Sequence, residues 1–105
     1  MTRDDPILRK LREGLEGLYG SRFKGLILFG STARGDDTPE SDIDLLVLLD
    51  GPVDGGAEVR RIWEVLYDVQ LECDRAISIM PEDAESYRRG ESALYENVQE
   101  EGIPI

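Results

Sequence analysis

Hydrophobic residues recur along the chain with helical spacing in some segments and with strand spacing in others. Between residues 6 and 19 they follow steps of three and four, which is typical of an amphipathic helix. The apolar positions are Ile7, Leu8, Leu11, Leu15, Leu18 and Tyr19. Asp5 is a suitable N-cap, Pro6 fits the first helical position and Gly20 can end the helix. The pattern therefore predicts a first helix over residues 6–19.

Three more apolar runs predict the strands of a sheet. Residues 24–29 should form one strand, stopped by Gly30, and residues 41–49 a second. The latter part of the second run is apolar on both faces, as expected of a central strand that is covered on both sides. Its two aspartates, Asp42 and Asp44, lie on one face at its entry end. A third short strand is expected at residues 75–80, ended by Pro81.

The remaining segments predict helices and a tail. Residues 57–71 should form a second amphipathic helix, and residues 82–101 should form polar helical segments broken near Gly90. The positions expected to be buried are Val59, Ile62, Trp63, Leu66 and Val69 in the first of these, and Leu94, Tyr95 and Val98 in the second. Residues 102–105 are a short apolar tail. The expected fold is a single α/β (α+β) domain over residues 1–105, with a small sheet flanked by helices.

Composition narrows the functions open to such a domain. The 105 residues carry a net charge of −11, which argues against direct binding to a nucleic-acid backbone. No apolar stretch approaches the roughly 20 residues that span a membrane. The residues before Pro6 lack the apolar core of a signal peptide, so we expect a cytoplasmic protein. With no histidine and only Cys73, a conventional zinc site is excluded, and any bound metal should be a hard, oxygen-preferring cation.

The chemistry concentrates in residues 30–44, which read GSTARGDDTPESDID. Gly30 lets the backbone approach a phosphate closely, and Ser31 suits the N-cap of a short helical turn, whose free N–H groups attract anions. Asp42 and Asp44, two positions apart on a strand, could hold Mg²⁺ against substrate phosphates. Taken singly, the first feature could be a plain strand-ending turn and the second a pair of solvated acids. Their combination indicates a nucleoside triphosphate site with magnesium.

Gly30-Ser31, ten intervening residues and Asp42-Ile43-Asp44 resemble the defining motif of the DNA polymerase β-like nucleotidyltransferases. The stretch 28–49 is similar to the minimal nucleotidyltransferase branch of that family. The resemblance implies that family's fold, with a small mixed sheet, and nucleotidyl transfer from a nucleotide such as ATP. By position, it implies that Gly30 and Ser31 hold phosphates and that Asp42 and Asp44 hold Mg²⁺. Arg34 would support the phosphates, unless it is an ordinary surface residue.

The resemblance also implies a third catalytic carboxylate on a neighbouring strand, where it would assist the metal and act as a general base. Residues 75–80 contain no acid. Asp74 just precedes them and shares the alternation of Ala76 and Ser78, so it is the candidate for this role. A different strand register would put Ser78 there and leave the site one acid short. Glu72 is a more distant substitute.

The minimal branch is commonly paired with a small helical HEPN protein. The resemblance therefore implies an antitoxin that transfers AMP from ATP to a tyrosine of such a partner. The chain's acidity agrees with a protein that does not handle RNA itself. The alternative is a nucleotide-binding module that is catalytically weak or inactive and neutralises its partner by occlusion. The pattern leaves the nucleotide base and the oligomeric state open.

Overall fold

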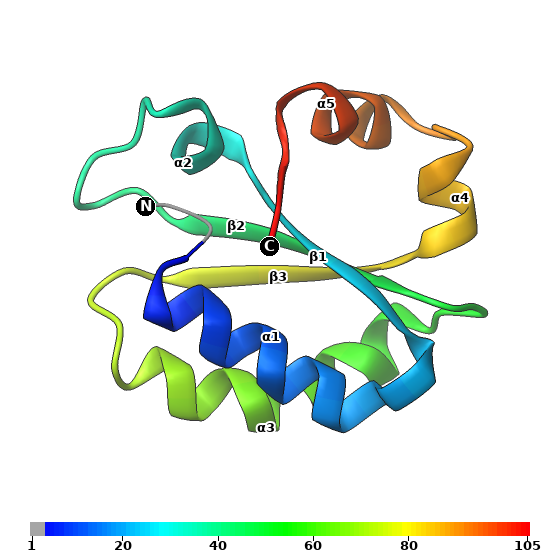
Figure 1. Cartoon of the computed structure of the whole chain (residues 1–105), viewed down its shortest axis with the longest axis horizontal. Coiled ribbons are helices and arrows are strands. Elements are labelled where there is room, and N and C mark those ends of the chain that lie inside the picture. Colours follow the sequence, from blue (N-terminus) through cyan, green and yellow to red (C-terminus); the bar gives the residue numbers. More distant parts are fainter. Residues whose placement is uncertain (1–3) are drawn as a thin grey trace.

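The computed structural model describes residues 4–105 and confirms the predicted α+β class, with a four-stranded mixed sheet between two layers of helices (Figure 1). The helices are α1 (Pro6–Tyr19), the 3₁₀ turn η1 (Gly20–Arg22), α2 (Gly30–Arg34), α3 (Gly55–Gln70), α4 (Ala84–Arg88) and α5 (Ala93–Glu101). The strands are β1 (Phe23–Phe29), β2 (Ile43–Leu49), β3 (Ile77–Asp83) and β4 (Ile103–Pro104). In sheet order they run β3-β2-β1-β4, with only the β2–β3 pair parallel.

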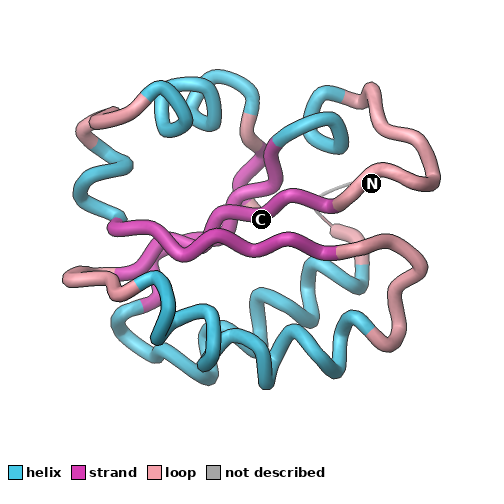
Figure 2. Tube along the Cα trace, turned by 180° about the vertical axis from the view of Figure 1, so that it is seen from behind, coloured by secondary structure: helices cyan, strands magenta, loops and turns pink. Residues whose placement is uncertain are grey.

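The sheet separates two unequal helical layers. Helices α1 and α3 cover one face, and α2, α4 and α5 lie over the other, as the front and rear views both show (Figures 1 and 2). None of the helices within residues 4–105 is long and apolar enough to cross a membrane.

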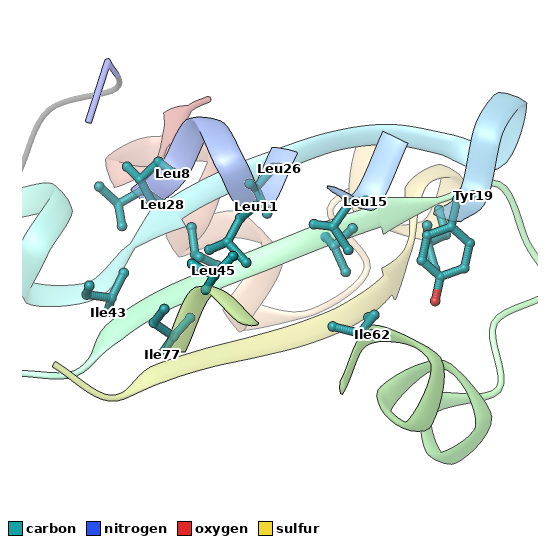
Figure 3. Close-up of a cluster of buried hydrophobic side chains, with 13 residues drawn as sticks. Leu8, Leu11, Leu15, Tyr19, Leu26, Leu28, Ile43, Leu45, Ile62 and Ile77 are labelled. Carbon is teal, nitrogen blue, oxygen red and sulfur yellow. The ribbon is translucent and has the colours of Figure 1, made fainter. Parts of the chain in front are cut away.

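Helix α1 forms as its sequence pattern predicts. The Asp5 carboxylate accepts a hydrogen bond from the Ile7 amide at 2.9 Å, and the helix ends at Gly20, whose φ of 56° suits a residue without a Cβ. Most of the predicted apolar stripe is buried in the core, where Leu11 and Leu15 are both fully enclosed (Figure 3), but Leu18 is exposed. Local signals thus fix both ends of α1, and burial fixes its orientation.

Strand β2 lies inside the sheet and is covered on both faces, as predicted. Its side chains Ile43, Leu45, Val47 and Leu49 face α1 and α3 and are fully buried. On the opposite face, Leu46 and Leu48 join a smaller buried cluster with Ile27, Ala84 and Val98. Asp44 continues this second face toward the start of the strand, because side chains alternate along a strand.

One prediction about the sheet edges is wrong, and one edge strand was not predicted. Pro81 does not end the third strand, which runs over Ile77–Asp83. Strand β3 is at the edge and pairs only with β2, so one side of its backbone needs no partner and a proline without an N–H is tolerated. The short apolar tail contains the unpredicted strand, because Ile103–Pro104 pairs antiparallel with β1 as β4.

The buried face of α3 also differs from the prediction. Val59 and Trp63 are half exposed, at 50% and 55%, and they point away from the sheet. Ile62 and Val69 are buried and Leu66 packs against the core, as predicted. Val65, which was not predicted, also packs against the core and lies close to Gly14 of α1. In α5, Val98 is buried as expected, and Leu94 and Tyr95 are partly buried.

Candidate nucleotide and metal site

The turn after β1 lies directly against Asp44, the acid inside β2. In the antiparallel register Phe29 pairs with Asp44, which places Gly30 beside the Asp44 side chain. A Cβ on Gly30 would lie 2.6 Å from Oδ2 of Asp44, closer than real Cβ contacts allow. The φ of Gly30 is also 73°, in the left-handed region that favours glycine. Glycine is therefore required here twice, once by the backbone and once by the carboxylate.

Asp42 and Asp44 form the paired acids that the sequence predicts. Asp42 is exposed and immediately precedes β2, whereas Asp44 is the second residue of the strand and is partly buried. Burial raises the pKa of the Asp44 carboxyl, and the negative charge of Asp42 raises it further. In the described residues no ion pair neutralises either acid, whereas carboxylate oxygens suit a hard divalent cation. The donor set fits Mg²⁺.

Helix α2 joins the turn to the acids. It begins at Gly30, one residue before the predicted start, so Ser31 is its second residue and not its N-cap; the cap residue is Phe29, without a side-chain bond. Gly35 ends the helix with a φ of 79°. The chain then returns to β2 through a hydrogen-bonded turn in which Thr38 N–H donates to Oγ of Ser41 at 2.9 Å. Gly30 and Ser31 are thus held beside Asp44 by a short, defined connection.

The structure does not bring a third acid to this pair. The parallel register places Ser78 beside Asp44, which is the alternative register considered above. Asp74 lies in the bend before β3 and is exposed, as is Glu72 at the end of α3. Over residues 4–105 no group of three acidic, histidine or cysteine side chains is placed to hold a metal together. The catalytic role of Asp74 therefore remains a prediction without support from its position.

Arg34, the predicted phosphate-supporting arginine, is paired with acids. Its Nε contacts Oδ2 of Asp36 at 3.1 Å, and its Nη1 contacts Oε2 of Glu101 at 3.3 Å. The side chain lies on the surface at the C-terminal end of α2, away from Gly30. The contact with Glu101 links α2 to α5.

The sequence analysis missed Arg75, which follows the candidate Asp74. Its side chain is only 15% exposed and pairs with Oδ2 of Asp37 at 3.0 Å. The same guanidinium donates to the Ser41 carbonyl at 2.7 Å and to Oγ1 of Thr32 at 2.9 Å. No local pattern marks such a residue, because its partners lie 34 to 43 positions away along the chain.

The chain that forms this site matches a known protein family. Residues 8–103 match the family described as "Nucleotidyltransferase domain". The chain belongs to the nucleotidyltransferase family. Its enzyme class is thus the one that the sequence resemblance predicts. A relative from Methanocaldococcus jannaschii, named "Putative protein adenylyltransferase MJ0604", is 30% identical over 100 residues, which cover 94% of each chain.

Solved structures support the same fold for this nucleotidyltransferase. A crystal structure of a toxin–antitoxin with AMP-PNP matches 91% of the chain and 69% of its counterpart, with a TM-score of 0.65 and 23% identity. A mutant of the toxin–antitoxin MntA-HpeT matches all of the chain and 72% of its counterpart, with a TM-score of 0.59 and 23% identity. At this identity the likeness concerns the fold alone.

Proposed function

We propose that this nucleotidyltransferase transfers AMP from ATP, in the presence of Mg²⁺, to a hydroxyl of a protein partner. The observation that carries the proposal is the contact between the Gly30 turn and the Asp44 carboxylate. This contact supports the proposal, because a phosphate received by the turn and a divalent cation held by the carboxylate would then be neighbours, as a metal–triphosphate substrate needs. The relative named as a protein adenylyltransferase favours AMP as the group and a protein as the acceptor.

The proposed roles follow from position. Gly30 and Ser31, at the start of α2, would receive the terminal phosphates, because the first N–H groups of a helix have no partner within it. Asp42 and Asp44 would hold the magnesium that accompanies the triphosphate. When bound, the metal would neutralise phosphate charge and favour attack on the α-phosphorus with departure of pyrophosphate. The protein's own task would be to hold the nucleotide in line with the acceptor.

The proposed partner is a helical HEPN-type toxin, and the nucleotidyltransferase would be its antitoxin. The described toxin–antitoxin structures of the same fold support this assignment. The net charge of −11 adds a physical reason, since it disfavours nucleic acid as the acceptor. A tyrosine hydroxyl of the partner is the acceptor that this proposal names.

The test is a transfer assay with ATP labelled at the α-phosphate, Mg²⁺ and the helical protein encoded beside this chain. Label should appear on the partner and disappear when Mg²⁺ is chelated. Asp42→Asn and Asp44→Asn should each lower transfer by about 100-fold or more, beyond the effect typical of residues that only support a metal ligand. Asp68→Asn is the matched control, because Asp68 is an exposed acid on α3 across the sheet.

A second candidate function is supported by one observation. Ser78, and not an acid, lies beside Asp44 on β3, so the site is built from two carboxylates. Such a site could bind a nucleotide without turning it over and neutralise the partner by occlusion. In the same assay, an unlabelled partner in a tight complex that survives Asp44→Asn would favour occlusion. Absence of both label and complex would contradict both functions.

A further inference from the structure

Arg75 joins the two halves of the candidate site. One half is the turn at the start of α2, and the other is the connecting segment, residues 35–41, which leads to the paired acids. Nη2 of Arg75 donates to Oγ1 of Thr32, which is inside α2 and only 3% exposed. Nη1 and Nε donate into the connecting segment, to Asp37 and to the carbonyl of Ser41. One guanidinium therefore sets the distance between the phosphate turn and the residue before Asp42.

Arg75 is itself held in place. The Gln70 side chain, at the end of α3, donates to the Arg75 carbonyl at 2.8 Å and accepts from the Ile77 amide at 2.8 Å. Thr32, in addition to receiving Arg75, donates weakly to the Asp42 carbonyl at 3.4 Å. The chain of contacts thus runs from α3 through Arg75 to the backbone of Asp42. A planar guanidinium with donors in a fixed fork suits this three-way junction better than a lysine would.

We propose that Arg75 is a positioning residue of the nucleotide site, acting through the connecting segment and α2. This inference rests on the proposed function above, because it concerns the same site. Each of the three nitrogens of its guanidinium donates a hydrogen bond to a protein group, which suits a residue that acts through its neighbours. Without it, the turn at Gly30 and the acids at the start of β2 lose their common anchor.

Arg22 provides a matched control at the far end of the sheet. Its guanidinium also bridges separate segments, donating to the carbonyls of Asp50 and Pro52 and to Oε2 of Glu58. It precedes β1, whereas Gly30 follows it, so the seven residues of the strand put about 20 Å between the two arginine junctions. Loss of either arginine should destabilise the fold, but only loss of Arg75 should disturb the site.

The experiment measures binding of a non-hydrolysable ATP analogue with Mg²⁺ by calorimetry, together with thermal unfolding. Arg75→Met should weaken binding by about 10-fold or more, which is typical of residues that orient metal ligands. Arg22→Met should leave it within about twofold, because distant substitutions act independently. The nucleotide affinity of Arg75→Lys should lie between those of the wild type and Arg75→Met. If Arg75→Met misfolds, the double variant Arg75→Met/Asp37→Asn takes its place in the experiment, because it leaves no unpaired carboxylate at position 37.

Amide hydrogen exchange in the nucleotide-free protein gives a second reading. Arg75→Met should accelerate exchange at Asp36 and Ser41, whose amides bond within this region, and leave Asp50 unchanged. Arg22→Met should do the reverse, since the Asp50 amide donates to the Arg22 carbonyl. Faster exchange at Asp36 and Ser41 with wild-type nucleotide affinity would overturn the positioning role. Wild-type protein that binds no nucleotide would contradict the proposed function, and unchanged exchange would then overturn the inference as well.

Discussion

The two faces of the sheet are built differently. Among residues 4–105, thirteen buried side chains form one apolar cluster on the face covered by α1 and α3. In the same part of the chain the opposite face has a cluster of five, and it ends at the paired acids at the start of β2. The same strand serves both, since Leu45 faces the large cluster and Asp44 faces the other way. The large cluster can hold β2 in place while its other side carries charges that contribute no packing.

The faces also treat buried charge differently. Glu58, on α3, is only 3% exposed, and its carboxylate is matched by Arg22, Arg61 and the Tyr19 hydroxyl. Asp44 has no such partner among residues 4–105, and its pKa is raised by burial and then by the like charge of Asp42. A compensated acid stabilises the fold, whereas an uncompensated pair is suited to an external cation. The comparison separates structural charge from candidate functional charge.

The largest expected effect is on the apolar face. Leu45→Ala should lower the free energy of unfolding by about 3 kcal/mol, because Leu45 is fully buried and its truncation leaves a cavity. Urea unfolding measures this loss. Leu71→Ala is the control, since Leu71 is 70% exposed, and it should change stability by less than about 0.5 kcal/mol. Equal losses from both would refute the assignment of stability to this cluster.

A smaller loss is expected from the compensated charge. Glu58→Gln should cost about 2 kcal/mol in urea unfolding, because it weakens charge-assisted hydrogen bonds from Arg22 and Tyr19 in a buried place. It should also lower the pKa of Tyr19, which burial and then Glu58 raise to about 12. Ultraviolet titration of the phenolate reads this change. Glu64→Gln, exposed on the same helix, should do neither.

What the sequence predicts well is what local pattern determines. The capping of α1 by Asp5 and the double-sided burial of β2 both follow from residues close together in the chain. The face that α3 buries does not, because apolar residues occur on both of its sides and the contact of Val65 with Gly14 exists only in the folded chain. The two-residue strand β4 is too short to carry a period.

The candidate site divides in the same way. Gly30, Ser31, Asp42 and Asp44 lie within fifteen residues, so a motif can represent them. The residue opposite Asp44 on β3 depends on strand register, which puts Ser78 there and leaves Asp74 in the preceding bend. Arg75 depends on contacts with α2 and the connecting segment that only the folded chain creates. From sequence, Asp74 is the candidate site residue of this segment because of a family resemblance. In the folded chain it is its neighbour Arg75 that contacts the site.

The smallest expected effect concerns the uncompensated pair and has the opposite sign. Because the pKa of Asp44 is raised, the folded protein holds this proton more tightly than the unfolded chain does. This tighter proton binding stabilises the folded protein at pH values below the ordinary carboxyl pKa. The stabilisation is lost as the pH rises through the raised pKa of Asp44. At neutral pH the ionised pair is therefore destabilising. Asp44→Asn should raise the free energy of unfolding there, by less than about 1 kcal/mol because solvent screens the pair.

Thermal unfolding at neutral and at acidic pH measures this difference. The gain from Asp44→Asn should shrink toward acid pH, where wild-type Asp44 is itself protonated, while the exposed Asp68→Asn should show no such trend. Mg²⁺ should raise the wild-type midpoint and leave that of Asp44→Asn unchanged, since only a folded state that binds the ion is stabilised by it. A destabilised Asp44→Asn at neutral pH would mean that Asp44 supports the fold. The two faces of the sheet would then differ in packing alone, because the charged residues on both faces would stabilise the fold.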